Sequence, residues 1–571
     1  MLQGGGIRTV CELFESDAHF MNREITPGEI TNAAALPPQV AGAVLHLGSS
    51  VPANAAAQTQ QFRSQVGHIS RQSGIFFGGT VFSIGTAYIF KVYLARVLGA
   101  HDLGVYALGM TLVGFLGIFN GMGLPQSAVR FVASYAAANK FRQLHALLWR
   151  GATLLLAVNA LFAVIFLALG RWIAIRFYHA PVLVPYLPWF ALTMVTGAVA
   201  YFYGKVLAGY RELGRRTLIT NFVGSPLMML LTVLLISRGL GLQGYLMAQI
   251  FSGAVVCLLL LYVVRELTPT AARFSANRGA RLEREVWSFS AAMLGIGLME
   301  FLMVQVDKVA LGFYRGAREV GIYSVAAAVV AYVPLALSSV NQIFSPTISD
   351  LHTRGERALL GRLFQSLTKW VVGLTLPLAC VIIVFARPLM RIFGPDFEAG
   401  WPILIIGTLG QLVNCGVGSV GYLLLMSGNE KRLIKVQAVM AAVMVVLSAA
   451  LVPIWGIVGA AVAAAITNVG MNAWNLLQVR LALGLSPYNR SYFHVLPPAA
   501  AAIGVTLLLK KNSALFGHDW VAVGVAIFLA YMVFGAIVLV FGLNEDDRLI
   551  ANAIWLRVRG AVGRGPSEVA P

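Results

Sequence analysis

The sequence predicts an all-α integral membrane protein of about fourteen transmembrane helices: two six-helix lobes followed by two C-terminal helices. Hydrophobic residues make up 58% of the 571 positions and charged residues 11%, with a mean hydropathy of +0.77, unlike a soluble domain. The segment KVYLARVLGAHDLGVYAL at 91–108 also recurs as KVALGFYRGAREVGIYSV at 308–325. A parallel repeat of this kind is typical of secondary transporters, whose substrate path runs between the halves.

The predicted helices follow one another from residue 74 to residue 542. Each is an apolar run of roughly twenty residues, enough to cross about 30 Å of hydrocarbon at about 1.5 Å per residue. We expect spans near 74–97, 103–124, 147–169, 182–204, 217–237, 241–264, 288–312, 320–344, 370–393, 401–426, 433–455, 457–479, 494–509 and 520–542. Gly241 and Gly456, near the ends of the two halves, continue the repeat.

The composition divides the chain into six parts. Residues 1–72 are polar and rich in Ala, Gln and Ser, and they contain four prolines before position 53, so we expect a disordered cytoplasmic tail without a cleavable signal peptide. The further parts are an N-lobe at 73–264, a basic cytoplasmic linker at 265–287, a C-lobe at 288–480, two more helices within 481–545 and a cytoplasmic tail at 546–571.

Charge predicts the orientation of the chain. The net charge is +19, which in a soluble protein indicates nucleic-acid binding, but here Lys and Arg concentrate in alternate loops, above all 205–216 and 265–284. We therefore expect both termini in the cytoplasm, contacts with anionic membrane lipids and no nucleic-acid partner.

Few residues favour catalysis or a cofactor. Cys257, Cys380 and Cys415 fall inside predicted spans, and the nine histidines lie in tails, loops or span ends, so no disulfide, metal or cofactor is expected. No GxxxxGK[ST] loop indicates ATP use. A membrane-embedded sugar polymerase or transferase is a remote alternative, because the outer loops are short. The chain is predicted not to be an enzyme, and transport must draw on an ion gradient, the membrane potential or consumption of the product.

Two motifs carry a family resemblance. LARVLGAHDLGVYAL at 94–108 is similar to a Leu-Ala-x-x-Leu-Gly-x-x-x-x-Gly-x-Tyr pattern, and VDKVALGFYRGAREVGIYSV at 306–325 is similar to an Asp-[Lys/Arg]-x-x-Leu-Gly…Gly-x-Tyr pattern. Both patterns are found in the multidrug/oligosaccharidyl-lipid/polysaccharide (MOP) flippase superfamily, in its polysaccharide-type lipid-linked oligosaccharide flippases. The resemblance covers about residues 73 to 545 and implies a location in the inner membrane of a bacterium.

That resemblance implies a function. Members of the family flip polyprenyl-pyrophosphate-linked oligosaccharides, such as O-antigen or exopolysaccharide units, from the cytoplasmic to the periplasmic face by alternating access around a cationic cavity. A polysaccharide polymerase and export machinery are the implied partners. Peptidoglycan-precursor flippases and drug/cation antiporters share the fold and are the alternatives.

Charged residues inside the spans are the candidate site, because each costs about 2.5–3.5 kcal/mol at mid-bilayer. Lys91 and Lys308 are candidates for binding the diphosphate, or they snorkel to the interface. Arg96 lies about 140° around the helix from Lys91, so snorkelling is favoured, although we keep it as a cavity cation. Glu300 and Asp307 share a helix face and suit ion coupling, or they pair with the lysines.

Two prolines complete the candidate residues. Pro125 and Pro346 end corresponding predicted helices of the two halves, which suits bent gates, although close packing alone is the favoured explanation.

Overall fold

The computed structural model describes residues 51–270, 283–512 and 516–541. The chain divides into two units, 1–72 and 73–571. In the first unit, residues 51–72 are helical, which corrects the predicted disordered tail there, since Ala and Gln are good helix formers. Residues 1–50, most of the predicted linker and the predicted C-terminal tail lie outside the described residues.

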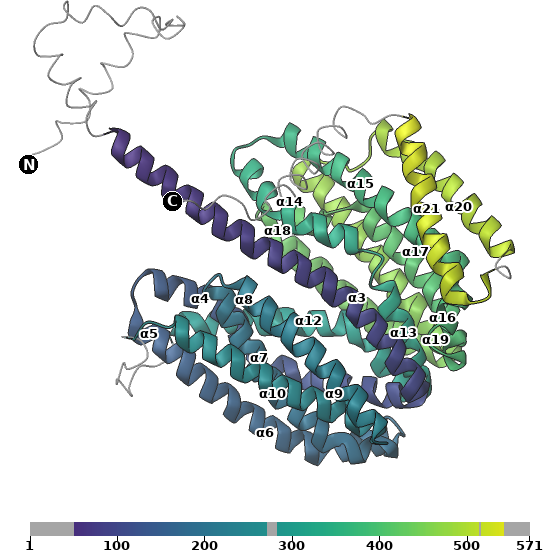
Figure 1. Ribbon diagram of the computed structural model, residues 1–571, viewed down its shortest axis with the longest axis horizontal. Coiled ribbons are helices and arrows are strands. Elements are labelled where there is room, and N and C mark those ends of the chain that lie inside the picture. Colours follow the sequence, from purple (N-terminus) through teal and green to yellow (C-terminus); the bar gives the residue numbers. More distant parts are fainter. Residues whose placement is uncertain (1–50, 271–282, 513–515, 542–571) are drawn as a thin grey trace, which may run out of the picture. The chain divides into compact units, whose positions relative to one another are not determined.

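All regular elements of the described residues are helical, as predicted (Figure 1). The elements before the linker are α3 (Val51–Asn120), α4 (Leu124–Ala137), α5 (Phe141–His145), η2 (Ala146–Arg150), α6 (Gly151–Trp172), η3 (Ile173–Phe177), η4 (Pro181–Tyr186), α7 (Leu187–Gly209), α8 (Leu213–Thr217), η5 (Leu218–Gly224), α9 (Ser225–Ser237) and α10 (Gly241–Leu267).

The elements after the linker are α12 (Arg284–Tyr314), α13 (Ala317–Val330), α14 (Leu335–Thr353), α15 (Arg357–Val384), α16 (Ala386–Arg391), η6 (Pro395–Gly400), α17 (Trp401–Val417), α18 (Val420–Met426), α19 (Glu430–Leu483), η7 (Arg490–Val495), α20 (Leu496–Lys511) and α21 (Asp519–Phe541).

Many of these helices are long and apolar enough to cross a membrane. Among the described residues there are 11 such helices, or up to 12 if the bent pair α13–α14 is one span. Two of them, α3 and α19, each consist of two helices joined at a kink, at Gly99 and Gly456. The all-helical membrane fold is therefore confirmed, and the count of about fourteen stays a prediction.

The sequence repeat is also a repeat of backbone geometry. Gly99 has φ 73° and ψ 177°, and its repeat mate Gly316 has φ 90° and ψ −178°. A positive φ of this kind favours glycine, because a Cβ atom would clash with the backbone. The two motifs therefore turn the chain in the same way at the same position.

The hydrophobic core shows how the two halves meet. One large cluster draws buried side chains from both halves, including Leu108 and Phe190 from the first and Phe385 and Phe393 from the second. Three smaller clusters are separate: one of first-half residues joined by Val286 of α12, and two of second-half residues, around Phe364 and around Val371. We call the end with Gly99 and Gly316 the shared end and the opposite end the divided end.

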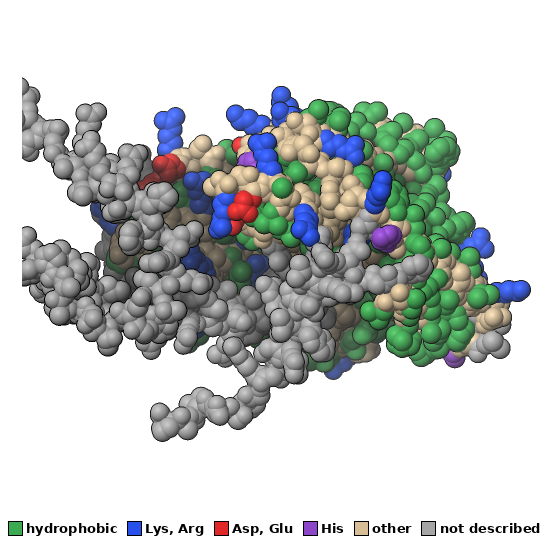
Figure 2. All heavy atoms as spheres, turned by 90° about the horizontal axis from the view of Figure 1, so that it is seen from above, with side chains coloured by type: hydrophobic (Ala, Val, Ile, Leu, Met, Phe, Trp, Pro, Cys, Tyr) green, Lys and Arg blue, Asp and Glu red, His purple; other side chains and the backbone are tan. Residues whose placement is uncertain are grey.

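The outer surface suits a lipid environment. Large apolar side chains are exposed on many helices; Leu258, Val446 and Leu539, for example, are 66%, 65% and 72% exposed. Figure 2 shows a broad area of hydrophobic side chains on one face, beside a region where Lys, Arg, Asp and Glu gather. Apolar side chains around a whole helix are typical of membrane spans.

Candidate substrate cavity

A cavity of about 670 Å³ lies between helices of the first half and α12. Its size is within the usual range for small-molecule sites. Its lining comes from α3 and the turn after it, α4, α7 and α12. The lining residues are Met110, Val113, Gly114, Gly117, Ile118, Asn120, Gly121, Gly123, Pro125, Gln126, Thr193, Met194, Gly197, Ala198, Tyr201, Met293, Leu294, Gly297, Glu300, Phe301, Val304 and Gln305.

One face of α12 forms a wall of this cavity. Gly297, Glu300, Phe301, Val304 and Gln305 follow the three- and four-residue spacing that places side chains on the same side of a helix. Glu300 is exposed to the cavity rather than buried in protein, and it is the one charged residue in the described lining. Within the described parts of the chain it makes no ion pair with Lys91 or Lys308.

The break between α3 and α4 positions the opposite wall. α3 ends at Asn120, whose Nδ2 donates to Oδ1 of the buried Asn159 at 2.7 Å. Gly123, with φ 66°, lies so close to the backbone of Ser290 that a Cβ would overlap its carbonyl oxygen. The hydroxyls of Ser127 and Ser290 are also hydrogen-bonded at 2.7 Å. α4 is therefore fixed against the start of α12, at the divided end.

The two predicted lysines lie near one another, beyond the cavity. Lys91 and Lys308 are both half-buried and within electrostatic range of each other, so the repeat brings its two cations together. Neither lines the cavity. Lys308 Nζ donates to Oε1 of Gln305 at 2.7 Å, and Gln305 does line it. Lys308 is thus connected to the cavity through one glutamine.

Asp307 is buried, 6% exposed, and does not line the cavity. One carboxylate oxygen accepts the backbone N–H of Lys308 at 2.7 Å, and the other accepts the hydroxyl of Tyr323. Buried carboxylates need such hydrogen bonds, because desolvation is costly. The structure therefore gives Asp307 a structural environment, distinct from the exposed setting of Glu300.

The shared end is closed by contacts between repeat mates. A Cβ on Gly104 would overlap the carbonyl oxygen of Ala317, and a Cβ on Gly321 would overlap that of Ala100. Ala100 and Ala317 are themselves repeat mates, as are the two glycines. The two motifs consequently touch backbone to backbone, and glycine is required at both contact points.

Arg96 strengthens this closure. Its side chain is exposed, and Nε donates to the carbonyl oxygen of Ile392 in the second half at 2.8 Å. Like Lys91 and Lys308, Arg96 does not line this cavity.

The two prolines have different positions. Pro125 lies in the first turn of α4 and lines the cavity, directly after the break that ends α3. Pro346 lies inside α14, which continues to Thr353, so the prediction that it ends a helix is wrong. In the second half, the chain bends by 53° between α13 and α14. Pro334 directly precedes the first residue of α14, and because proline has no backbone N–H, it interrupts the helical hydrogen bonds at this point.

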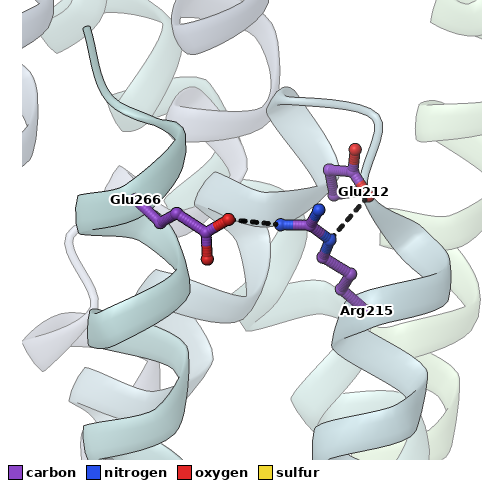
Figure 3. Close-up of polar contacts among 3 residues, drawn as sticks. All are labelled: Glu212, Arg215 and Glu266. Atoms are coloured by element: carbon purple, nitrogen blue, oxygen red, sulfur yellow. Dashed lines mark hydrogen bonds and ion pairs between the residues drawn. The ribbon is translucent and has the colours of Figure 1, made fainter.

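The basic loop after α7 is partly neutralised. Figure 3 shows Arg215 between the carboxylates of Glu266 and Glu212. Its Nη1 lies 3.4 Å from Oε1 of Glu266, and its Nε lies 3.7 Å from Oε2 of Glu212. Exposed pairs of this kind contribute little stability. They join the start of α8 to the end of α10 at the divided end.

Sequence reasoning missed several residues of the site. Gln126, Thr193, Tyr201 and Gln305 line the cavity, yet none is charged, and only their place in three dimensions identifies them. Tyr323 is different: the repeat already singled it out, sixteen residues after Asp307, but gave no sign that the two are bonded.

Comparison with known proteins confirms the resemblance predicted from the motifs. Residues 69–352 match the family described as "Polysaccharide biosynthesis protein". The succinoglycan biosynthesis transport protein ExoT of Rhizobium meliloti is 26% identical over 326 residues, which is 56% of this chain and 62% of ExoT. The chain thus spans less than two thirds of that relative.

Two solved structures share the fold. The lipid II flippase MurJ in an inward closed conformation has a TM-score of 0.63 at 14% identity, covering 81% of this chain and 98% of MurJ. An inward-facing multidrug resistance MATE transporter of the MOP superfamily has a TM-score of 0.60 at 14% identity, covering 70% of this chain and 95% of the transporter.

Proposed function

We propose that this protein, which has the fold of MOP-superfamily transporters and a polysaccharide biosynthesis family match over residues 69–352, is a lipid-linked oligosaccharide flippase. It moves polyprenyl-pyrophosphate-linked repeat units from the cytoplasmic to the periplasmic face of the inner membrane. The observation that carries the proposal is the family match on a fold that holds an open, mixed polar and apolar cavity against α12.

The arrangement of the cores supports alternating access. The halves share one core at the shared end and have separate cores at the divided end. By the predicted orientation the divided end faces the cytoplasm, where the substrate is made. Rocking of the halves about the repeat axis then closes this end and opens the other.

The lysine pair is the proposed diphosphate site. Lys91 and Lys308 come from repeat-related helices and lie within electrostatic range of each other, an unfavourable arrangement for two like charges that are half-buried. An anionic ligand between them removes that cost. Arg96 has the separate role of joining the halves at the shared end.

Glu300 is the proposed coupling group. A proton or cation bound at this carboxylate would change the charge of the cavity during the cycle. Cation antiport is accordingly the second candidate function, and the observation that favours it is that the one charge in the described lining is negative.

Deletion of the gene in its own host tests the proposed function. We expect lipid-linked oligosaccharide to accumulate on the cytoplasmic face and surface polysaccharide to fall, with both restored by the wild-type gene. Unchanged polysaccharide with increased sensitivity to cationic compounds would instead identify an antiporter.

Cysteine labelling tests the orientation. In a variant without native cysteines, a single cysteine placed between residues 265 and 284 should react with an impermeant maleimide only after the cells are permeabilised. Labelling in intact cells contradicts the cytoplasmic linker.

A further inference from the structure

We infer that the cavity on α12 is the compartment for the glycan of the substrate, and that the diphosphate does not enter it. This inference rests on the proposed function. It assigns the glycan of the substrate to the cavity and the diphosphate to Lys91 and Lys308. It starts from the charge of the lining: of 22 lining residues one is charged, and that residue is Glu300. A diphosphate carries the same sign and is repelled there.

The polar groups of the cavity suit sugar hydroxyls. Gln126, Tyr201 and Thr193 line it on the side of α4 and α7, and Gln305 lies across from them on α12. The Oε1 of Gln305 accepts Lys308 Nζ, so its amide N–H groups remain to donate to a ligand. Glu300 supplies acceptors only, which match the hydroxyl donors of a sugar or the ammonium of an amino sugar.

The apolar groups suit the other side of a sugar ring, where C–H groups are exposed. Phe301 and Tyr201 present aromatic rings to the cavity from α12 and α7. Gly117 and Gly197 line it without side chains, and a Cβ on either would meet no atom within 4 Å. The space beside these rings is therefore open to a ligand, as in sites with an apolar wall and a few convergent polar groups.

Helix geometry then orients the substrate. Lys308 is eight residues from Glu300 on α12, a rise of about 12 Å at roughly 1.5 Å per residue. The cations lie beyond Gln305, toward the shared end, and the cavity extends from Gln305 toward Pro125 and the divided end. A lipid-linked oligosaccharide fits with its diphosphate at the lysines and its glycan in the cavity.

Labelling protection distinguishes the two ligand groups. A single cysteine is placed at Gly117 or Gly197 in the otherwise cysteine-free full chain, and its reaction with a maleimide is timed. Lipid-linked oligosaccharide extracted from the host membranes, at about ten times its Kd, should slow labelling about tenfold. Inorganic pyrophosphate at millimolar concentration should leave the rate unchanged. Equal protection by pyrophosphate, or none by the oligosaccharide lipid, overturns the inference.

Cavity filling gives a second, independent test. Gly117→Leu or Gly197→Leu places a side chain in the open space and should reduce polysaccharide export at least about tenfold, the loss expected from roughly 1.4 kcal/mol of binding. Gly504→Leu is the matched control, since a Cβ on Gly504 would likewise meet no atom within 4 Å, and this glycine lies in α20, outside the cavity. Wild-type export by both cavity variants, at normal protein levels, overturns the inference.

Charge reversal separates glycan from diphosphate at the same position. Glu300→Lys removes the acceptors and adds a cation, so we expect weaker protection by the oligosaccharide lipid than in Glu300→Gln, which keeps one acceptor. If pyrophosphate protects the cysteine in the wild-type background as well as in Glu300→Lys, the cavity takes phosphate and the inference fails. If the deletion strain shows no polysaccharide defect, the proposed function fails, whereas a defect without these labelling results refutes the glycan compartment alone.

Discussion

The two copies of the repeated motif have the same backbone and different chemistry. Tyr106 in the first copy accepts a hydrogen bond from Gln249 Nε2 at 2.8 Å, and its ring lies 4.9 Å from that of Tyr245. Tyr323 in the second copy donates to the buried carboxylate of Asp307. The first-half position that matches Asp307 is Phe90, an apolar residue.

This difference shows what the duplication kept. The turns at Gly99 and Gly316 and the contacts of Gly104 and Gly321 are the same in both copies, and they serve the joint between the halves. The carboxylates Glu300 and Asp307 occur only in the second copy, on α12. Symmetry is therefore retained at the joint between the halves, and it is lost on α12, where we propose that the site distinguishes the parts of the ligand.

The largest expected effect comes from the contact that the copies share. Gly104→Leu and Gly321→Leu each force a side chain into the carbonyl oxygen of the opposite copy, and we expect a loss of about 3 kcal/mol or more, at the upper end for overpacking. Thermal unfolding of the purified protein and export measure it. Gly85→Leu, where nothing lies within 4 Å, is the control. Destabilisation by only one of the pair would break the proposed symmetry.

The lysines test whether symmetry extends to charge. Lys91→Gln combined with Lys308→Gln should reduce export at least about tenfold at normal protein levels, the effect of roughly 1.4 kcal/mol of binding, whereas Arg at both positions keeps the cations and more activity. Among the single changes, Lys91→Gln should cost more, since Lys308 is already bonded to Gln305. Wild-type export by the double variant refutes the diphosphate site.

The tyrosines measure the asymmetry directly. Tyr323→Phe leaves a buried carboxylate short of a donor and should cost about 1.5–3 kcal/mol, the range for hydrogen bonds to charged groups. Tyr106→Phe removes a neutral hydrogen bond and should cost about 0.5–1.5 kcal/mol. Unfolding of both variants in the same detergent decides it. Equal costs would mean that Asp307 is not charged in the folded protein.

The smallest effect is expected at Arg96. Its hydrogen bond to Ile392 is exposed, so Arg96→Gln should change stability by less than about 1 kcal/mol and leave export near the wild-type level. Measured export decides between the two roles considered for this residue. A loss as large as that of the double lysine variant would identify Arg96 as a substrate cation.

The sequence predicted the parts of this molecule that depend on local pattern. Apolar runs predicted the helical membrane fold, and the repeat related Lys91 to Lys308, which lie within electrostatic range of each other; their role as substrate cations stays a prediction. The cavity could not be predicted, because its lining combines helices far apart in the chain. The sequence also did not show that the second-half bend lies beside Pro334 and not at Pro346. Either proline is compatible with a kink, and only the packing of the folded protein decides between them.

The reciprocal contact at the shared end has an evolutionary consequence. Ala100 meets Gly321 as Ala317 meets Gly104, which is the pattern of an isologous interface, where one surface pairs with a second copy of itself. A single ancestral half carrying Ala and Gly at these two positions already held both sides of the joint. Two copies of such a half, paired through this contact, would form a symmetric homodimer, whereas a single chain permits its two halves to differ, as they do at Glu300 and Asp307.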